Sequence, residues 1–326
     1  MTTDAPSPAG VPAAGTPLVL RGREVGRGPD GVLRPVVMAI VNRTTDSFYA
    51  PARRPDDGAA LDAAHRAWED GAQILDVGGV RAGVGPDVDE AEEIARVAPF
   101  VARVREELPD LFVSVDTWRS GVAREVVAAG ADLVNDTWAG HDPALVEVAG
   151  AAGVGVVCSH TGGAVPRTDP YRVEYPPAPA PGTDPGTDPG TDPRDGVLDD
   201  VVATLRAAAA RAVACGVPPR SVLVDPTHDF GKNTWQSLHL VRRTTVLAGL
   251  GYPLLMALSR KDFVGETLGL PPDERLEGTL AATALAAWQG ATVFRAHDVA
   301  ATRRVLDLVA AVRDEAPPAG VLRGLA

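Results

Sequence analysis

The sequence is poor in cysteine and in long apolar runs, and it carries no export signal. Its two cysteines among 326 residues, Cys158 and Cys215, both lie in apolar surroundings. This usage is typical of reduced core thiols, so we expect neither a disulfide nor a cysteine metal site. No apolar run approaches the roughly 18 residues that a membrane-spanning helix needs. The N-terminal MTTDAPSPAG lacks the basic and apolar regions of a secretory signal. These absences predict a cytoplasmic protein that does not cross a membrane.

Positive charge is also scarce. The chain has 31 Lys and Arg against 43 Asp and Glu, which gives a formal net charge of −12. No basic domain or stripe is visible, and this argues against a nucleic-acid partner. An acidic chain can still bind an anion, provided that its few basic residues converge in one pocket.

What the sequence does contain is a repeated pattern of short apolar runs, each ending in polar residues. Such runs, alternating with helical segments, are typical of buried parallel strands. The eight runs end at Asn42, Asp76, Asp116, Asn135, Ser159-His160, Asp225, Ser259-Arg260-Lys261 and Arg295. Eight alternations of strand and helix favour a single-domain α/β fold, the (β/α)8 TIM barrel, with one shared site on its C-terminal rim. An open dinucleotide-binding sheet is disfavoured, because the turn 42–48 lacks glycine.

We expect the barrel to span residues 35–315. It lies between an N-terminal tail (1–34), disordered in its first part, and a C-terminal tail (316–326). An insertion at 163–195 contains PGTD three times in tandem. Pro and Gly at this density prevent helix and sheet, so we interpret the insertion as a solvated excursion. It leaves from the rim, so the alternative that it covers the site stays open.

The residues at the strand ends divide by charge. Asn42 and the oxygen-rich loop after it could ligate a hard cation such as Mg2+. Acceptors end four of the strands and suit a flat heterocycle with N–H donors; they are Asp76, Asp116, Asn135 and Asp225. Cations follow the last two strands, where barrels commonly bind phosphate; these loops carry Ser259-Arg260-Lys261 and Arg295-Ala296-His297. The division predicts a ligand with a donor-rich ring at one end and a phosphate group at the other.

Each of these residues also has a simpler explanation. A strand-end Asp is more often a helix N-cap than a ligand, and Asp46 and Asp229 fit a turn or cap role. His160 fits a rim histidine without a chemical function. Only the shared position of the polar residues, at one end of consecutive strands, favours a site over packing.

Seven segments, in this order, resemble the signature blocks of the dihydropteroate synthase family. They are MAIVNRTTDSF, DVGG, SVDT, LVNDTWAG, VDPTHDFGKN, ALSRKDFVGE and FRAHDV, and they extend over about residues 35–315. The resemblance implies a (β/α)8 barrel that forms a homodimer and acts in folate biosynthesis. Enzymes of this family are transferases that join 6-hydroxymethyl-7,8-dihydropterin diphosphate to p-aminobenzoate and release diphosphate.

The resemblance also implies roles for individual residues, in a reaction that needs no nucleophile. Asn42 would ligate Mg2+, and Asp116 and Lys261 would support the reaction while they contact the pterin. The remaining substrate-binding residues would be Asp76, Asn135 and Asp225 at the pterin, Phe230, Ser259 toward the aminobenzoate, and Arg295 and His297 at the diphosphate.

The loops depart from the family pattern. After DVGG the family continues Glu-Ser-Thr-Arg-Pro-Gly, whereas residues 80–85 read VRAGVG. The family blocks Asn-Val-Thr-Pro-Asp-Ser-Phe, Met-His-Met and Asp-Pro-Gly-Ile-Gly-Phe-Gly-Lys read NRTTDSF (42–48), SHT (159–161) and DPTHDFGK (225–232). The residues for the pterin and the diphosphate are therefore kept, while the loops that build the second-substrate site are rewritten.

Three functions stay open. The first is an active synthase that uses p-aminobenzoate or another amine. The second is a pterin-diphosphate-binding paralogue with lost or altered activity, like the divergent second copy found in actinobacteria. The third, a folate-dependent methyltransferase, is disfavoured because Arg295 and His297 suit a diphosphate, which methyl transfer lacks.

Overall fold

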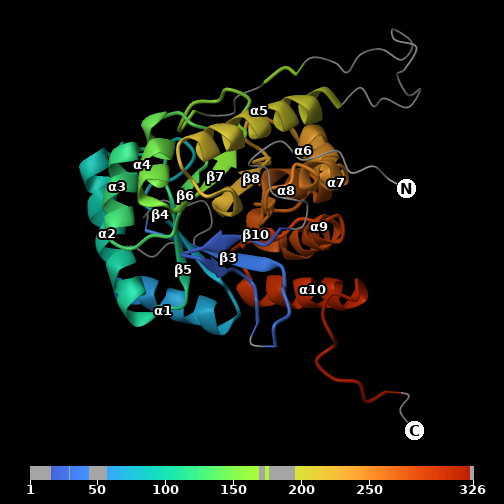
Figure 1. Cartoon of the computed structure of the whole chain (residues 1–326). Coiled ribbons are helices and arrows are strands. Elements are labelled where there is room, and N and C mark those ends of the chain that lie inside the picture. Colours follow the sequence, from blue (N-terminus) through green and yellow to red (C-terminus); the bar gives the residue numbers. More distant parts are fainter. Residues whose placement is uncertain (1–15, 29, 44–56, 169–172, 176–194, 324–326) are drawn as a thin grey trace.

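A computed structural model of the chain describes residues 16–28, 30–43, 57–168, 173–175 and 195–323. Eight parallel strands form its central sheet in the order β8-β7-β6-β5-β4-β3-β10-β9. A parallel bridge between Val224 and Leu254 joins β8 to the start of β9, so the sheet closes on itself. Helices surround this barrel (Figure 1). The predicted (β/α)8 TIM barrel is confirmed.

Strands and helices alternate along the chain. The barrel strands are β3 (Val36–Asn42), β4 (Ile74–Gly78), β5 (Phe112–Asp116), β6 (Leu133–Asp136), β7 (Gly155–Ser159), β8 (Val222–Asp225), β9 (Leu255–Met256) and β10 (Val293–Ala296). The helices are α1 (Asp57–Glu69), α2 (Glu90–Glu107), α3 (Ser120–Ala128), α4 (Ala144–Ala152), α5 (Asp195–Ala214), α6 (Thr234–Arg242), α7 (Thr244–Ala248), α8 (Asp262–Leu268), α9 (Leu276–Trp288) and α10 (Val299–Val312). Within the described ranges, no helix has the length and apolar composition that crossing a bilayer requires.

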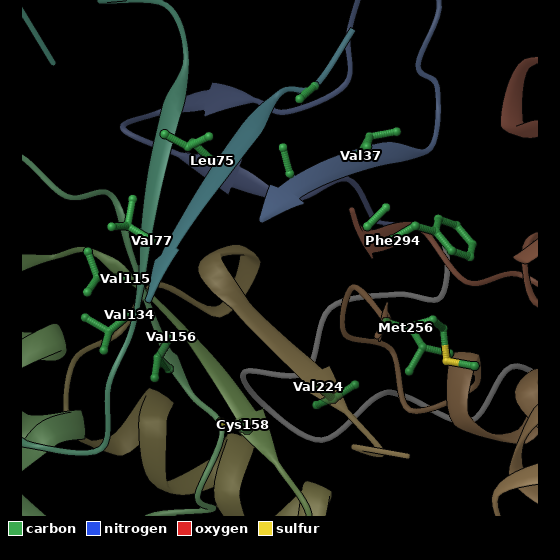
Figure 2. Close-up of a cluster of buried hydrophobic side chains, with 14 of the residues drawn as sticks. Val37, Leu75, Val77, Val115, Val134, Val156, Cys158, Val224, Met256 and Phe294 are labelled. Atoms are coloured by element: carbon green, nitrogen blue, oxygen red, sulfur yellow. The ribbon is translucent and has the colours of Figure 1, made fainter. Parts of the chain in front are cut away.

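Two apolar cores follow from the alternation of side chains along the strands. One set of residues faces outward against the helices, and Figure 2 draws part of it, including Val37, Leu75 and Phe294. The alternate set faces the barrel interior, with Met38, Ile74 and further residues from the other strands. Because both faces are buried, the strands read as continuous apolar runs in the sequence.

A short hairpin closes the amino-terminal end of the barrel. Strands β1 (Val19–Leu20) and β2 (Arg23–Glu24) pair antiparallel. Leu18, Leu20 and Val25 of this segment belong to the same buried cluster as the inward-facing strand residues. The sequence analysis placed these residues in the N-terminal tail, because two-residue strands leave no periodic signal. The site must therefore form at the opposite end.

Two connections in the second half of the barrel carry more than one helix. Helices α6 and α7 meet at Arg243, which is the last cap of one and the first cap of the other. Helix α8 begins directly after Lys261 and precedes α9. Most of the insertion 163–195 and of the first loop 42–48 lies outside the described residues.

Candidate functional site

Alternation along the strands carries polar side chains into the mouth of the barrel. Residues two positions apart on a strand face the same side of the sheet. The inner core contains Ile74, Leu133, Leu223 and Val293. Two positions further along, the same inward-facing positions carry Asp76, Asn135, Asp225 and Arg295. The interior is therefore apolar in its lower part and polar at the carboxyl ends of the strands.

Asp76 is the buried centre of this polar group. Its Oδ1 accepts a hydrogen bond from Ser114 Oγ at 2.6 Å, and its Oδ2 accepts one from Asn135 Nδ2 at 3.1 Å. Arg295 Nε donates to the same Oδ2 at 2.6 Å. Because both oxygens are occupied and the residue is fully buried, Asp76 orients Asn135 and Arg295.

Arg295 bridges two carboxylates. Besides Asp76, it contacts Asp116, whose Oδ2 lies 3.0 Å from Arg295 Nη2. Thr137 Oγ1 donates to the other oxygen of Asp116 at 2.8 Å. Burial raises the pKa of Asp116 to about 6, although the Arg295 guanidinium opposes this shift. The acceptor side and the cationic side of the mouth are thus coupled, since ligand donors would compete with Arg295 for Asp116.

Asn135 and Asp225 complete the acceptor side. Asn135 pairs in register with Asp116, so their side chains leave adjacent strands at one level. Asp225 is 4% exposed, and its Oδ1 accepts the backbone N–H of Thr227 at 2.7 Å. Burial raises the pKa of Asp225, against the opposing effects of Lys261 and Arg295 nearby. The structure thus brings together the acceptors that the sequence predicted.

Lys261 lies near Asp225 and contacts the Phe230 ring. Lys261 Nζ donates to the backbone oxygen of His228 at 2.6 Å and lies 4.5 Å from the centroid of the Phe230 ring. Phe230 also contacts Trp138, with the two ring centroids 5.2 Å apart in an edge-to-face arrangement. Burial lowers the pKa of Lys261. An aromatic ring with a cation over it forms one wall of the mouth.

Ser259 and His297 form a hydrogen-bonded pair. Ser259 Oγ lies 2.9 Å from His297 Nδ1 and accepts the backbone N–H of His297 at 3.2 Å. A hydroxyl has one donor and two acceptor sites, so Ser259 Oγ can donate to Nδ1 or accept from it, according to the imidazole tautomer. Burial, together with the nearby Arg295 charge, lowers the pKa of His297 to about 3. His297 is therefore neutral at physiological pH and offers a hydrogen bond, not a positive charge.

Arg260 does not belong to the mouth. The charge pattern grouped it with the phosphate-binding cations, but its side chain is buried elsewhere and bonded to Asp298. Arg260 Nε and Nη2 lie 2.9 Å and 3.0 Å from the two Asp298 oxygens, and Nη1 donates to the backbone oxygens of Pro272 and Asp273. Arg260 fastens the loop after β9 to the start of α10. His160 is likewise held by a carboxylate, with Nε2 2.7 Å from Asp200 Oδ2.

Asn42 ends β3 beside the end of β4. It pairs in register with Gly78, and a Cβ at Gly78 would lie 3.0 Å from Asn42 Oδ1. The described residues include no group of three His, Cys, Asp or Glu that could hold a metal ion. The Asn42 amide oxygen is a hard ligand of the kind that Mg2+ binds together with waters and phosphate oxygens, so this residue fits the ion.

The backbone conformation of the loop after β8 was not predicted from the sequence. Thr227 and Asp229 both have left-handed backbones, with φ of 51° and 69°. The family block has glycine at both positions, and this difference was the available signal. Asp229 was interpreted as a turn or cap residue, and it does accept the first backbone N–H groups of α8. Asp46 lies outside the described residues.

The sequence profile of a family described as pterin binding enzyme matches residues 38–297. The chain is 56% identical to the inactive dihydropteroate synthase 2 of Mycobacterium leprae, over 90% of this chain and 96% of that protein. It is 34% identical to the dihydropteroate synthase of Bacillus subtilis, over 85% of this chain and 88% of that enzyme.

Solved structures agree with these sequence matches. The dihydropteroate synthase of Yersinia pestis, in complex with a sulfonamide drug, superposes with a TM-score of 0.77 at 32% identity. The alignment covers 92% of this chain and 100% of the Yersinia pestis chain. The similarity therefore extends over the barrel as a whole, including every strand that contributes to the mouth.

Proposed function

Because the chain belongs to the family of pterin binding enzymes and is dihydropteroate synthase-like, we propose that its barrel mouth binds 6-hydroxymethyl-7,8-dihydropterin diphosphate. We propose in addition that its condensation with p-aminobenzoate is lost or strongly reduced. The first part rests on the residues at the strand ends, and the second on the loops beyond them. The two parts can be tested separately.

The observation that carries the pterin proposal is the cluster of buried acceptors at one end of the barrel. Asp116, Asn135 and Asp225 offer carboxylate and amide oxygens from three strands, and Lys261 offers donors beside them. A pterin ring carries amino and N–H donors along one edge and a carbonyl oxygen next to them. Buried carboxylates are costly unless they are paired. Asp116 already accepts from Thr137 and Arg295, and Asp225 accepts from the Thr227 backbone, so the N–H groups of a donor-rich ring would add to or replace these bonds.

The diphosphate end is proposed at Arg295, His297 and Asn42. Arg295 would supply charge, while the neutral imidazole of His297 would supply a hydrogen bond without charge. Asn42 would hold Mg2+ together with the diphosphate, and the ion would supply Lewis-acid stabilisation of the leaving group. The charge that leaves with diphosphate would be matched by a developing cation on the pterin methylene. Asp76 and Asp116 favour that positive charge electrostatically.

The loop after β4 supports a loss of the standard transfer. Residues 82 and 83 are Ala and Gly, where the family has Thr and Arg for the diphosphate and the aminobenzoate. The ends of the loop are fastened, because Arg96 Nη1 donates to the oxygen of Gly79 at 2.9 Å and Arg119 Nη2 to that of Val88 at 2.7 Å. The cation of this segment is Arg81, two positions before the place of the family's Arg, so the family's charge for orienting a second substrate is missing from its usual position.

The binding proposal is tested by calorimetric titration of the pterin diphosphate, with Mg2+ and with EDTA. We expect micromolar or tighter binding that weakens at least tenfold in EDTA, as loss of a metal–phosphate contact requires. Asn42→Ala should bind equally in the two buffers. Asp225→Asn should weaken binding in both buffers, since it removes an acceptor for the ring and not the metal. Equal affinity of the wild-type protein with and without Mg2+ would contradict the role of the ion.

We further propose a cytoplasmic homodimer. Helices α7 to α10 carry Val246, Leu268, Leu285, Trp288, Leu308 and Val312, each at least 44% exposed, and we propose that these side chains together form one apolar face. Helices α2 to α5 carry no large apolar side chain of comparable exposure within their described residues. An exposed apolar face confined to neighbouring helices is typical of an interface, and a second copy of the chain is the simplest partner.

A further inference from the structure

The loop after β8 contains a carboxylate where the family block has glycine. Asp229 has φ 69°, a left-handed conformation that Asp tolerates better than most residues. The contacts of its side chain hold it there. Ser237 of α6 donates from Oγ to Asp229 Oδ1 at 3.3 Å and accepts the Asp229 backbone N–H at 3.2 Å. These contacts therefore hold the Asp229 side chain in one place.

Asp229 faces the segment that carries Lys261. Its Oδ2 accepts the backbone N–H of Asp262 at 2.7 Å, and its Oδ1 accepts that of Phe263 at 3.3 Å. In the reverse direction, Lys261 Nζ donates to the backbone oxygen of His228 at 2.6 Å. Three hydrogen bonds thus fasten the two loops to each other, and they hold Asp229 against the segment that carries Lys261.

The charges of Asp229 and Lys261 act on each other. Burial lowers the pKa of Lys261, and Asp229 is the carboxylate that opposes this shift most. Burial raises the pKa of Asp229, and Lys261 is the group that opposes that shift most. Two further carboxylates act on Lys261: Asp225, which belongs to the proposed pterin pocket, and Asp262, which is paired with Arg275 at 2.8 Å. Asp229 is therefore the carboxylate with the largest effect on the Lys261 charge, and it adds to that of Asp225.

We propose that Asp229 is a specificity-determining residue for the second ligand: its carboxylate balances Lys261 from within the chain and disfavours a second ligand that carries a carboxylate of its own. This inference rests on the proposed function, because it concerns the partner of the bound pterin. A glycine at this position leaves the Lys261 charge available to an anionic aromatic amine. With Asp229 present, a neutral aromatic amine fits the Phe230 wall without electrostatic repulsion. The ligand class is thus a neutral amine, and p-aminobenzoate is discriminated against.

Two variants separate charge from shape. Asp229→Asn removes the charge, while its Oδ1 can still accept a backbone N–H and Asn tolerates the left-handed backbone. Asp229→Gly removes the whole side chain at a backbone angle that suits glycine. Asp199→Asn, at an exposed carboxylate on α5, is the matched control. Thermal unfolding of each variant checks that the fold is retained.

The measurement is the ratio of the dissociation constants for p-aminobenzoate and p-aminobenzamide, which differ by one charge. Titrations at pH 8 use protein alone and protein saturated with 6-hydroxymethyl-7,8-dihydropterin and diphosphate, so that no transfer occurs. We expect Asp229→Asn and Asp229→Gly to shift the ratio about tenfold toward the carboxylate, as removing one nearby charge does. Asp199→Asn should leave the ratio unchanged.

An unchanged ratio in Asp229→Asn would overturn the inference. It would also be overturned if neither the wild-type protein nor any of the variants bound either amine. A failure of the proposed function looks different, since the wild-type protein would then not bind the pterin diphosphate at all. The amine ratio measured without pterin depends only on the side of the mouth next to Lys261. It therefore tests Asp229 in either case.

Discussion

Arg295 shows how much of the site depends on single residues brought together by the fold. It contacts Asp76 and Asp116, which lie 219 and 179 positions away in the sequence. The sequence placed all three at strand ends, but it assigned Arg295 to the diphosphate and the acids to the pterin. The pairing was not predictable, because the strand-end pattern gives the level of each residue in the barrel and not its partner. In the structure, the Arg295 guanidinium joins residues that the sequence assigned to opposite ends of the proposed ligand.

His228 is a buried residue for which stability gives a direct test. It is fully buried, and neither ring nitrogen has a hydrogen-bond partner among the described residues. A buried polar group without partners costs roughly 1–3 kcal/mol. The family block has Ile at this position, so we expect His228→Ile to raise the free energy of unfolding by about 1–2 kcal/mol at pH 7.5. Urea unfolding measures the change.

The same variant should also change the pH dependence of stability. Burial lowers the pKa of His228 well below its ordinary value, so the folded state keeps it neutral. The unfolded chain takes up a proton below about pH 6.5, and stability is therefore lost as the pH falls. Between pH 7.5 and 5.5 the advantage of His228→Ile should grow by about 1.4 kcal/mol. Replacing the exposed His141 by Ile is the control, and a constant advantage at both pH values would contradict the argument.

At the scale of elements, the strands were predictable and the loops were not. Each barrel strand combines a short apolar run with a polar end, and this pattern survives because both faces of the strand are buried. The hairpin Val19–Glu24 has no such pattern, since its strands have only two residues each. Helix α8 begins directly after Lys261, which the sequence analysis assigned to a loop. Its first backbone N–H groups donate to Asp229, and such a contact between distant residues leaves no local signal in the sequence.

The loop after β4 is the element to which we attribute the loss of transfer. Restoring Ser-Thr-Arg-Pro at positions 81–84 returns the residues of the family block. If this loop is the main defect, the rate of dihydropteroate formation should rise at least tenfold, because oriented second-substrate contacts are regained. A variant with the same four residues in the order Pro-Arg-Ser-Thr controls for composition. No gain over that control would shift the cause to Asp229 or to the loop after β3.

At the scale of the whole molecule, the apolar face over α7 to α10 predicts self-association. The wild-type protein should elute with twice the chain mass in light-scattering chromatography. Leu285→Glu places a charge in this face and should give monomers, because an unpaired charge in an apolar interface is costly. Trp68→Glu, at a residue of α1 that is 40% exposed, is the matched control. A monomeric wild-type protein, or equal effects of the two variants, would contradict the proposed interface.

The barrel fold was the feature that the sequence predicted best, and the catalytic activity was the feature that it predicted least. The eight strand ends indicated the fold class and the shared position of the acceptors, since parallel strands bring their carboxyl ends to one rim. Whether a reaction follows depends on loops whose residues, such as Ala82 and Gly83, tolerate many conformations. We therefore propose that the strand ends keep a pterin pocket and that the loops and Asp229 alter what can react there.

The account is tested most directly by following diphosphate release from purified protein supplied with the pterin diphosphate and Mg2+. The same samples should be titrated for pterin binding, and the Bacillus subtilis enzyme should run in parallel. We predict tight binding of the pterin diphosphate together with a release rate that p-aminobenzoate leaves unchanged. Release that p-aminobenzoate stimulates to the rate of the Bacillus enzyme would contradict the account, because the rewritten loops would then support a complete second-substrate site.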